Sequence, residues 1–123
     1  MKLLVGITIL LFPASLFAQE TKTDSLYIVT YTTGPNWDVK KSPNDQPYFK
    51  EHSANLGKLR KEGVIKAGAR YGDKGIIFIM ASSMVAAKEI IFADPAVVNK
   101  LFNADVQKLH VFYDGCIEKI KTN

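Results

Sequence analysis

The chain of 123 residues carries a formal net charge of +4, and hydrophobic residues make up 47% of it. This length supports one hydrophobic core rather than two, and so mild a positive charge does not indicate a nucleic-acid partner. Cys116 is the only cysteine, which excludes an intrachain disulfide and leaves thiolate metal sites and redox exchange without support.

The first 18 residues have the composition of a secretory signal peptide. A basic start precedes the apolar run Leu3–Phe12, which is too short to span a bilayer, and Ala18 is a small residue suited to cleavage. We therefore expect export to the periplasm or the medium, with residues 1–18 as the signal, 19–25 as a polar linker and 26–123 as one domain. The competing interpretation is a buried N-terminal strand or helix.

The first half of that domain predicts a strand, a long loop and a helix. Leu26–Thr33 is rich in β-branched and aromatic residues, as strands are. Gly34–Gln46 is rich in Gly, Pro, Asn and Asp, which favour a loop. Proline suits the first helical position, so a helix is expected over Pro47–Glu62, and Gly63 ends it.

The second half predicts three strands and further helical segments. Ser82 or Ser83 can cap a helix, and Asp94-Pro95 interrupts it because proline disfavours a helical residue before it. The expected elements are strands at Val64–Tyr71, Ile76–Ala81 and Asp105–Tyr113, a helix that includes Val85–Ile91, and a short helical stretch at Ala96–Phe102.

The element order β-α-β-β-α-β predicts an α+β fold of the ferredoxin-like type. In that topology a four-stranded antiparallel sheet carries two helices on one face, and the first and third strands are central. Ile76–Met80 is apolar at every position, as a central strand should be. The second strand is expected to alternate, with Lys66, Gly68 and Arg70 on the face opposite to Ile65, Ala67 and Ala69.

Apolar residues on both faces of the central strands require a second cover, because two helices cover one face only. A second copy of the chain, packed sheet on sheet with twofold symmetry, is the economical cover, so a homodimer is expected. The competing explanation is a binding groove on the open face.

His52 is the leading candidate for chemistry. It shares one helical stripe with Phe49, Leu56 and Leu59, and histidine serves as a general acid or base near neutral pH. The alternative is a partly buried structural histidine. Asp94 lies near the inward face of the second helix and can orient an imidazole, or it simply ends that helix together with the following proline.

Three further residues are candidates for ligand binding. Trp37 lies in the long loop, which either covers a pocket or is merely anchored by this ring. Arg70 on the second strand either meets an anionic ligand or is a solvated edge charge. Tyr31 lines the same end of the sheet or merely packs there. His110 has no partner at metal-ligand spacing, so no metal site is expected, and it is interpreted as structural or exposed.

Two segments resemble the YCII-related (YciI-like) family. His52–Gly68 contains a histidine, leucines along a helix, a glycine and a strand ending in Ala-Gly, and Phe92–Val97 contains an Asp-Pro pair after an Ala- and Glu-containing helix. The resemblance extends over Leu26–Tyr113. It implies a ferredoxin-like fold that forms dimeric α+β barrels, with His52 and Asp94 at the positions of that family's recurrent histidine and aspartate.

The function expected from these features is a small-molecule site that requires no cofactor. In an enzyme, a His-Asp pair would perform general acid–base chemistry, as in a lyase, isomerase or hydrolase. The alternative is a non-catalytic periplasmic module for ligand binding or dimerisation. No phosphate-binding glycine-rich loop and no nucleophile motif is present in the sequence.

Overall fold

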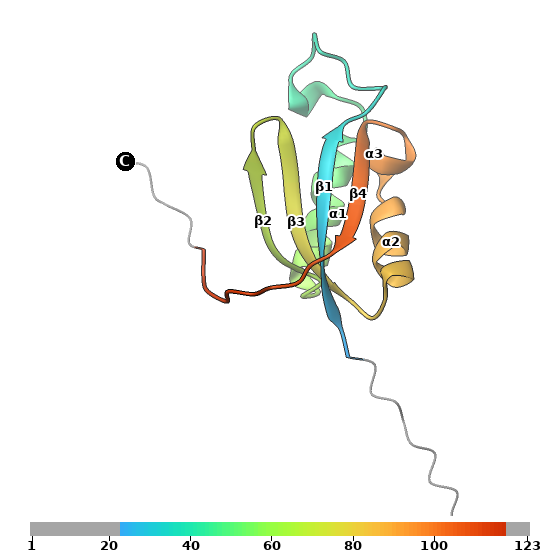
Figure 1. Ribbon diagram of the computed structural model, residues 1–123. Helices are drawn as coiled ribbons and strands as arrows, with labels where there is room; N and C mark the ends of the chain where they lie inside the picture. Colours follow the sequence, from blue (N-terminus) through green and yellow to red (C-terminus); the bar gives the residue numbers. More distant parts are fainter. Residues whose placement is uncertain (1–22, 118–123) are drawn as a thin grey trace, which may run out of the picture.

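The computed structural model describes residues 23–117 (Figure 1). The expected signal peptide, 1–18, and most of the expected linker lie outside the described residues, and Ser25 already belongs to the first strand. The elements are β1 (Ser25–Thr33), the 3-10 helix η1 (Pro43–Asp45), α1 (Phe49–Lys61), β2 (Ile65–Tyr71), β3 (Lys74–Ala81), α2 (Met84–Phe92), α3 (Pro95–Val98) and β4 (Phe102–Lys108).

The strands form one antiparallel sheet in the order β2-β3-β1-β4, with β3 and β1 at its centre. The helices lie on one side of it, with α1 behind the sheet and α2 and α3 beside β4 in Figure 1. An α+β fold built on a four-stranded antiparallel sheet is therefore confirmed. No helix within residues 23–117 has the length and apolar character needed to cross a membrane.

The core lies between the sheet and the helices. Val29 and Ile79, from the two central strands, are 0% exposed, and Ile91 of α2 is 1% exposed in the same cluster. Leu56 and Leu59 of α1 pack against this cluster. Helices α1 and α2 therefore share the same face of the sheet, and alternation along each strand directs every second side chain to the opposite face.

The opposite face of the sheet is also apolar at its centre. Leu26 is paired with Met80 and Ile28 with Phe78, and paired residues share a face. All four side chains are half-buried, and no helix in the described part of the chain covers them.

Four expected boundaries were wrong. Helix α1 begins at Phe49 rather than at Pro47, because Tyr48 has a left-handed backbone with φ of 68°. Helix α3 ends at Val98, since Lys100 also has a positive φ, 57°, which turns the chain into the sheet. Strand β4 therefore starts at Phe102, inside the expected helical stretch, and it ends at Lys108 rather than at Tyr113.

The expected alternation of β2 was also wrong, because the strand contains a bulge. Ile65 pairs with Ile79, but the next paired residue, Ala67, lies opposite Phe78, so Lys66 is an extra residue. After the bulge, each side chain of β2 points to the face opposite to the one that strict alternation predicts. Arg70 consequently lies opposite Gly75 on the helix-covered face.

The junction between β1 and the following loop leaves no space for a side chain at Gly34. Its N–H donates to the carbonyl oxygen of Leu101 at 2.7 Å, and a Cβ atom would overlap the carbonyl oxygen of Lys100.

Gly34→Ala should therefore lower the free energy of unfolding by about 1–3 kcal/mol, as measured by urea denaturation. Gly57→Ala is the control: nothing lies within 4 Å of the added Cβ in exposed α1, and a gain of about 0.5–1 kcal/mol is expected. Equal effects of the two substitutions would contradict this packing.

Candidate functional site

A buried hydrogen-bonded pair joins helix α1 to the start of α3. His52 is the one buried residue of α1, and its Nδ1 lies 2.9 Å from Oδ1 of Asp94, which is 1% exposed. Asp94 is the N-cap of α3, and its Oδ1 also accepts from the N–H of Ala96 at 2.9 Å. Its Oδ2 accepts from Nδ2 of Asn55 at 2.7 Å. The carboxylate thus has three donors from two helices.

These contacts determine the protonation of the pair. Burial by itself raises the pKa of Asp94, but the hydrogen bonds from His52 and Asn55, the interaction with the imidazole and the Ala96 N–H together lower it below its ordinary value. An ionised carboxylate only accepts hydrogen bonds, so Nδ1 of His52 carries the ring proton. In the neutral imidazole Nε2 then holds the lone pair, and no other described residue is hydrogen-bonded to it.

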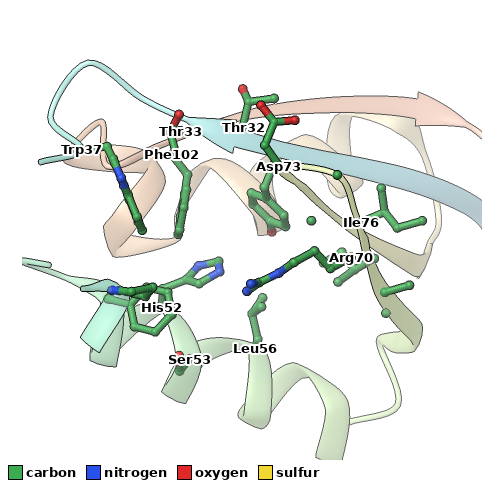
Figure 2. Close-up of a pocket in the computed structure, with 18 residues that line it drawn as sticks. Thr32, Thr33, Trp37, His52, Ser53, Leu56, Arg70, Asp73, Ile76 and Phe102 are labelled. Atoms are coloured by element: carbon green, nitrogen blue, oxygen red, sulfur yellow. The ribbon is translucent and has the colours of Figure 1, made fainter. Parts of the chain in front are cut away.

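The imidazole of His52 points into a cavity at one end of the sheet (Figure 2). The cavity has a volume of about 590 Å³, within the range of small-molecule sites. Helix α1, the ends of β1, β2 and β3, and the loop after β1 enclose it. Its aromatic lining consists of Tyr31, Trp37, Phe49 and Phe102.

These four rings form the aromatic wall of the cavity, and Phe102 lies at its centre. Its ring centroid lies 5.0 Å from that of His52 and 5.6 Å from that of Trp37. The rings of Tyr31 and Phe49 lie 6.2 and 6.3 Å from it. These offset and tilted rings bury one side of the imidazole, so the wall fixes its plane as well as lining the cavity.

The tyrosine hydroxyl beside this wall is buried and unpaired. Tyr31 is 6% exposed, its ring contacts that of His52 edge-on at 5.3 Å, and its Oη has no partner among the described residues. Burial, with the nearby charge of Asp94, raises the pKa of Tyr31 far above its ordinary value. The hydroxyl therefore stays protonated and is available as a donor.

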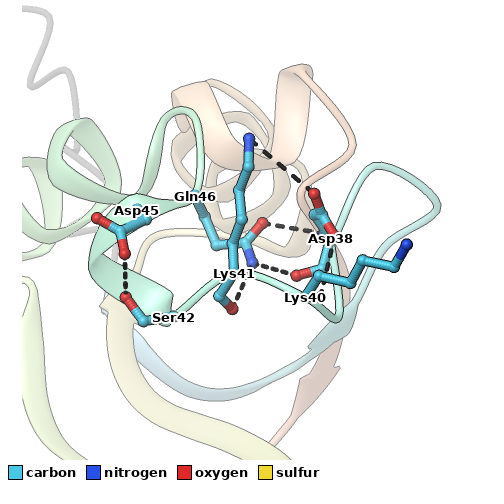
Figure 3. A network of polar contacts seen from close by, with 6 residues as sticks. All are labelled: Asp38, Lys40, Lys41, Ser42, Asp45 and Gln46. Atoms are coloured by element: carbon cyan, nitrogen blue, oxygen red, sulfur yellow. Dashed lines mark hydrogen bonds and ion pairs between the residues drawn. The ribbon is translucent and has the colours of Figure 1, made fainter.

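The loop that carries Trp37 is fixed by one buried glutamine. Gln46 is 4% exposed, and its Oε1 accepts from the N–H of Asp38 at 3.0 Å (Figure 3). Its Nε2 donates to the carbonyl oxygens of Asp38 at 2.6 Å and of Lys41 at 3.2 Å. These three hydrogen bonds satisfy backbone groups of the loop that would otherwise need a partner. They hold the loop, and with it Trp37, against the cavity.

The structure brings four of the five predicted site residues to the cavity lining: Tyr31, Trp37, His52 and Arg70. Asp94 lies behind His52 and does not line the cavity. The remaining histidine, His110, is exposed beyond the end of β4, and Cys116 is also exposed.

Two residues of the site escaped the sequence analysis. Asn55 lies three positions after His52, on the same side of the helix, so its spacing was an available signal. Phe102 had no such signal, because the expected helical stretch ended on it and the start of β4 was placed at Asp105.

A scan against protein-family models and a search of the curated proteins found no match. Across residues 23–117 no group of three or more His, Cys, Asp or Glu side chains is placed to hold a metal ion. What the cavity can do chemically follows from the imidazole, the guanidinium and the aromatic rings that line it.

The protonation of Asp94 predicts how stability depends on pH. Because its folded-state pKa is lowered, the carboxylate contributes stability that is present above the unfolded pKa of about 3.9 and is lost as the pH falls through the folded-state value. Asp94→Asn should cost about 3 kcal/mol near pH 5, and this difference from the wild type should shrink toward pH 3.

Urea unfolding of both proteins between pH 5 and pH 3 measures this difference. Asp105→Asn, at an exposed carboxylate of β4, is the control and should change stability little at any pH. A cost of Asp94→Asn that stayed constant over the range would contradict a buried, ionised Asp94.

Proposed function

We propose that this protein is an enzyme that transfers a proton within a small organic molecule bound in the cavity, without a cofactor. The observation that carries the proposal is the pairing of His52 Nδ1 with buried Asp94 at 2.9 Å, which leaves Nε2 on the cavity side as a base. An imidazole held in one tautomer by a carboxylate is the arrangement used for general acid–base catalysis.

The proton balance limits the reaction class. Nε2 takes a proton from a carbon or oxygen of the substrate, and the resulting imidazolium is stabilised by Asp94. Return of that proton to another substrate atom completes an isomerisation, and its delivery to a leaving group completes an elimination, as in a lyase. Proton removal from a water molecule would give hydrolysis instead. Tyr31 can donate a hydrogen bond to the negative charge that develops, after a small shift of its buried hydroxyl.

The resemblance to the YCII-related family supports the same proposal. The strand order β2-β3-β1-β4 is compatible with a ferredoxin-like topology, and His52 and Asp94 match the recurrent positions of that family. We also retain the proposals that residues 1–18 direct export to the periplasm or the medium and that the domain forms a dimeric α+β barrel.

A second candidate function is a non-catalytic ligand-binding or dimerisation module. The observation that favours it is the number of hydrogen bonds that Asp94 accepts. Its carboxylate caps α3 and also accepts from Asn55 and His52 of α1, so it joins the two helices. Such a brace stabilises the fold even when no proton is transferred.

Proton transfer can be tested with phenylpyruvate, an aromatic 2-keto acid with acidic hydrogens next to its carbonyl group. In D2O the wild type should accelerate deuterium exchange at that carbon, as followed by NMR. His52→Gln should slow the protein-catalysed exchange by about 10²–10⁴-fold, because it removes the base. His110→Gln removes the exposed histidine and should match the wild type. Equal exchange by the wild type and His52→Gln would favour the non-catalytic module.

The dimer proposal concerns the open apolar face of the sheet. Phe78 and Met80 lie near its centre, so a second copy packed there would bury them. Phe78→Lys should convert a dimer into a monomer in analytical ultracentrifugation, while Val39→Lys, at an 88% exposed loop residue, should leave the dimer intact. A monomeric wild type would contradict this proposal.

A further inference from the structure

The side chain of Arg70 enters the cavity only because β2 is bulged. Directly opposed residues of antiparallel strands share a face, so Arg70 stands in one row with Gly75 and Tyr31 on the helix-covered side. Figure 2 shows its guanidinium extended across the cavity toward the imidazole of His52. Without the extra residue Lys66, strict alternation from buried Ile65 would direct this side chain to the other face.

The bulge is itself held in place. The carbonyl oxygen of Lys66 accepts a hydrogen bond from Nη1 of Arg60 on α1 at 2.9 Å. This bond satisfies a backbone group that the bulge removes from the sheet ladder. One arginine of α1 thus helps to position another arginine, Arg70, in the cavity.

The guanidinium of Arg70 has no anionic partner in the described part of the chain. The ion pairs there involve other groups, and Asp73, the one acidic residue at the cavity lining, is paired with Nζ of Lys74 at 3.2 Å. Arg70 is exposed and lines the cavity. Without an anionic partner, its guanidinium suits a ligand with a planar anionic group, because its N–H donors match a carboxylate in two parallel hydrogen bonds.

Space for such a ligand exists because two glycines face the helices. Gly68 and Gly75 lie on the same face as Arg70 and present no side chain to the cavity. A Cβ on Gly75 would meet only the Cβ of Tyr31, at 3.9 Å, so a side chain is absent there without any steric need in the strand. Beyond this floor lie the rings of Trp37 and Phe102, whose planes are tilted by 32° and which belong to the aromatic wall.

We propose that the ligand of this site is a small aromatic carboxylic acid, whose carboxylate binds Arg70 and whose ring lies along the aromatic wall next to His52. This inference rests on the proposed function, and it names the substrate class. A single guanidinium balances one negative charge, which favours a carboxylate over a doubly charged phosphate. With its carboxylate on Arg70, which extends toward His52 in Figure 2, the ligand lies next to this histidine, which can remove a proton from it.

Binding of three related probes tests the ligand class: cinnamate, neutral cinnamamide and phenyl phosphate. Isothermal titration calorimetry of the wild type should show cinnamate binding about 10–100-fold more tightly than cinnamamide, and more tightly than phenyl phosphate. Arg70→Gln should abolish the preference for cinnamate over cinnamamide. Lys88→Gln removes one positive charge from an exposed position of α2, outside the cavity, and should keep the preference.

Gly75→Val provides a second variant that suits a β-strand and fills the cavity floor. It should weaken cinnamate and cinnamamide alike, with circular dichroism reporting a folded protein. Absence of cinnamate binding to the wild type at millimolar concentration, a preference for phenyl phosphate, or a preference for cinnamate that survives Arg70→Gln would each overturn the inference.

The two proposals fail in different ways. His52→Gln should still prefer cinnamate over cinnamamide, because it leaves Arg70 and the wall unchanged. If the preference is present but deuterium exchange does not depend on His52, the carboxylate inference stands and the enzymatic proposal fails. If His52-dependent exchange is seen on phenylacetone, a neutral ketone, while cinnamate is not preferred, the carboxylate inference fails and the enzymatic proposal stands.

Discussion

One buried carboxylate connects the helical layer of this protein to its cavity. Asp94 caps α3, accepts from Asn55 and His52 of α1, and is itself 1% exposed. A buried charge is costly unless it is paired and hydrogen-bonded, so its three donors offset the cost of burying it. The same bonds fix the ring of His52. A single constraint therefore determines both how α1 meets α3 and which nitrogen of the imidazole is free.

The sheet contributes a second constraint, which determines the groups that face Nε2 of His52. The bulge at Lys66 directs Arg70 to the helix-covered side, while Gly68 and Gly75 leave the floor open. Cavity, base and cation thus originate in local departures from regular structure: a cap, a bulge and two missing side chains. Bulges and glycines weaken a strand unless something compensates for them, and bulges are over-represented next to sites of function.

The sequence predicted the α+β class, the four strands and the inward position of His52, because apolar periodicity and capping residues act locally. Ser83 does cap α2, with its side chain accepting from the N–H of Ala86. Such patterns did not predict which face of the sheet the Arg70 side chain occupies. A bulge depends on the fit between β2 and β3 and not on the residues of β2 alone. The left-handed backbone of Tyr48 was likewise hidden, since residues other than glycine rarely adopt it and nothing in the local sequence marks this one.

The central claim is that Asp94 holds His52 as the Nδ1-protonated tautomer, with Nε2 free toward the cavity. Nitrogen-15 NMR of the neutral imidazole, recorded at a pH that deprotonates the imidazolium, measures this directly, since protonated and unprotonated ring nitrogens resonate at well-separated frequencies. The account predicts a protonated Nδ1 and an unprotonated Nε2 in the wild type, and loss of that fixed tautomer in Asp94→Asn. A His52 ring protonated on Nε2 alone, or one whose tautomer is unaffected by Asp94→Asn, would contradict it.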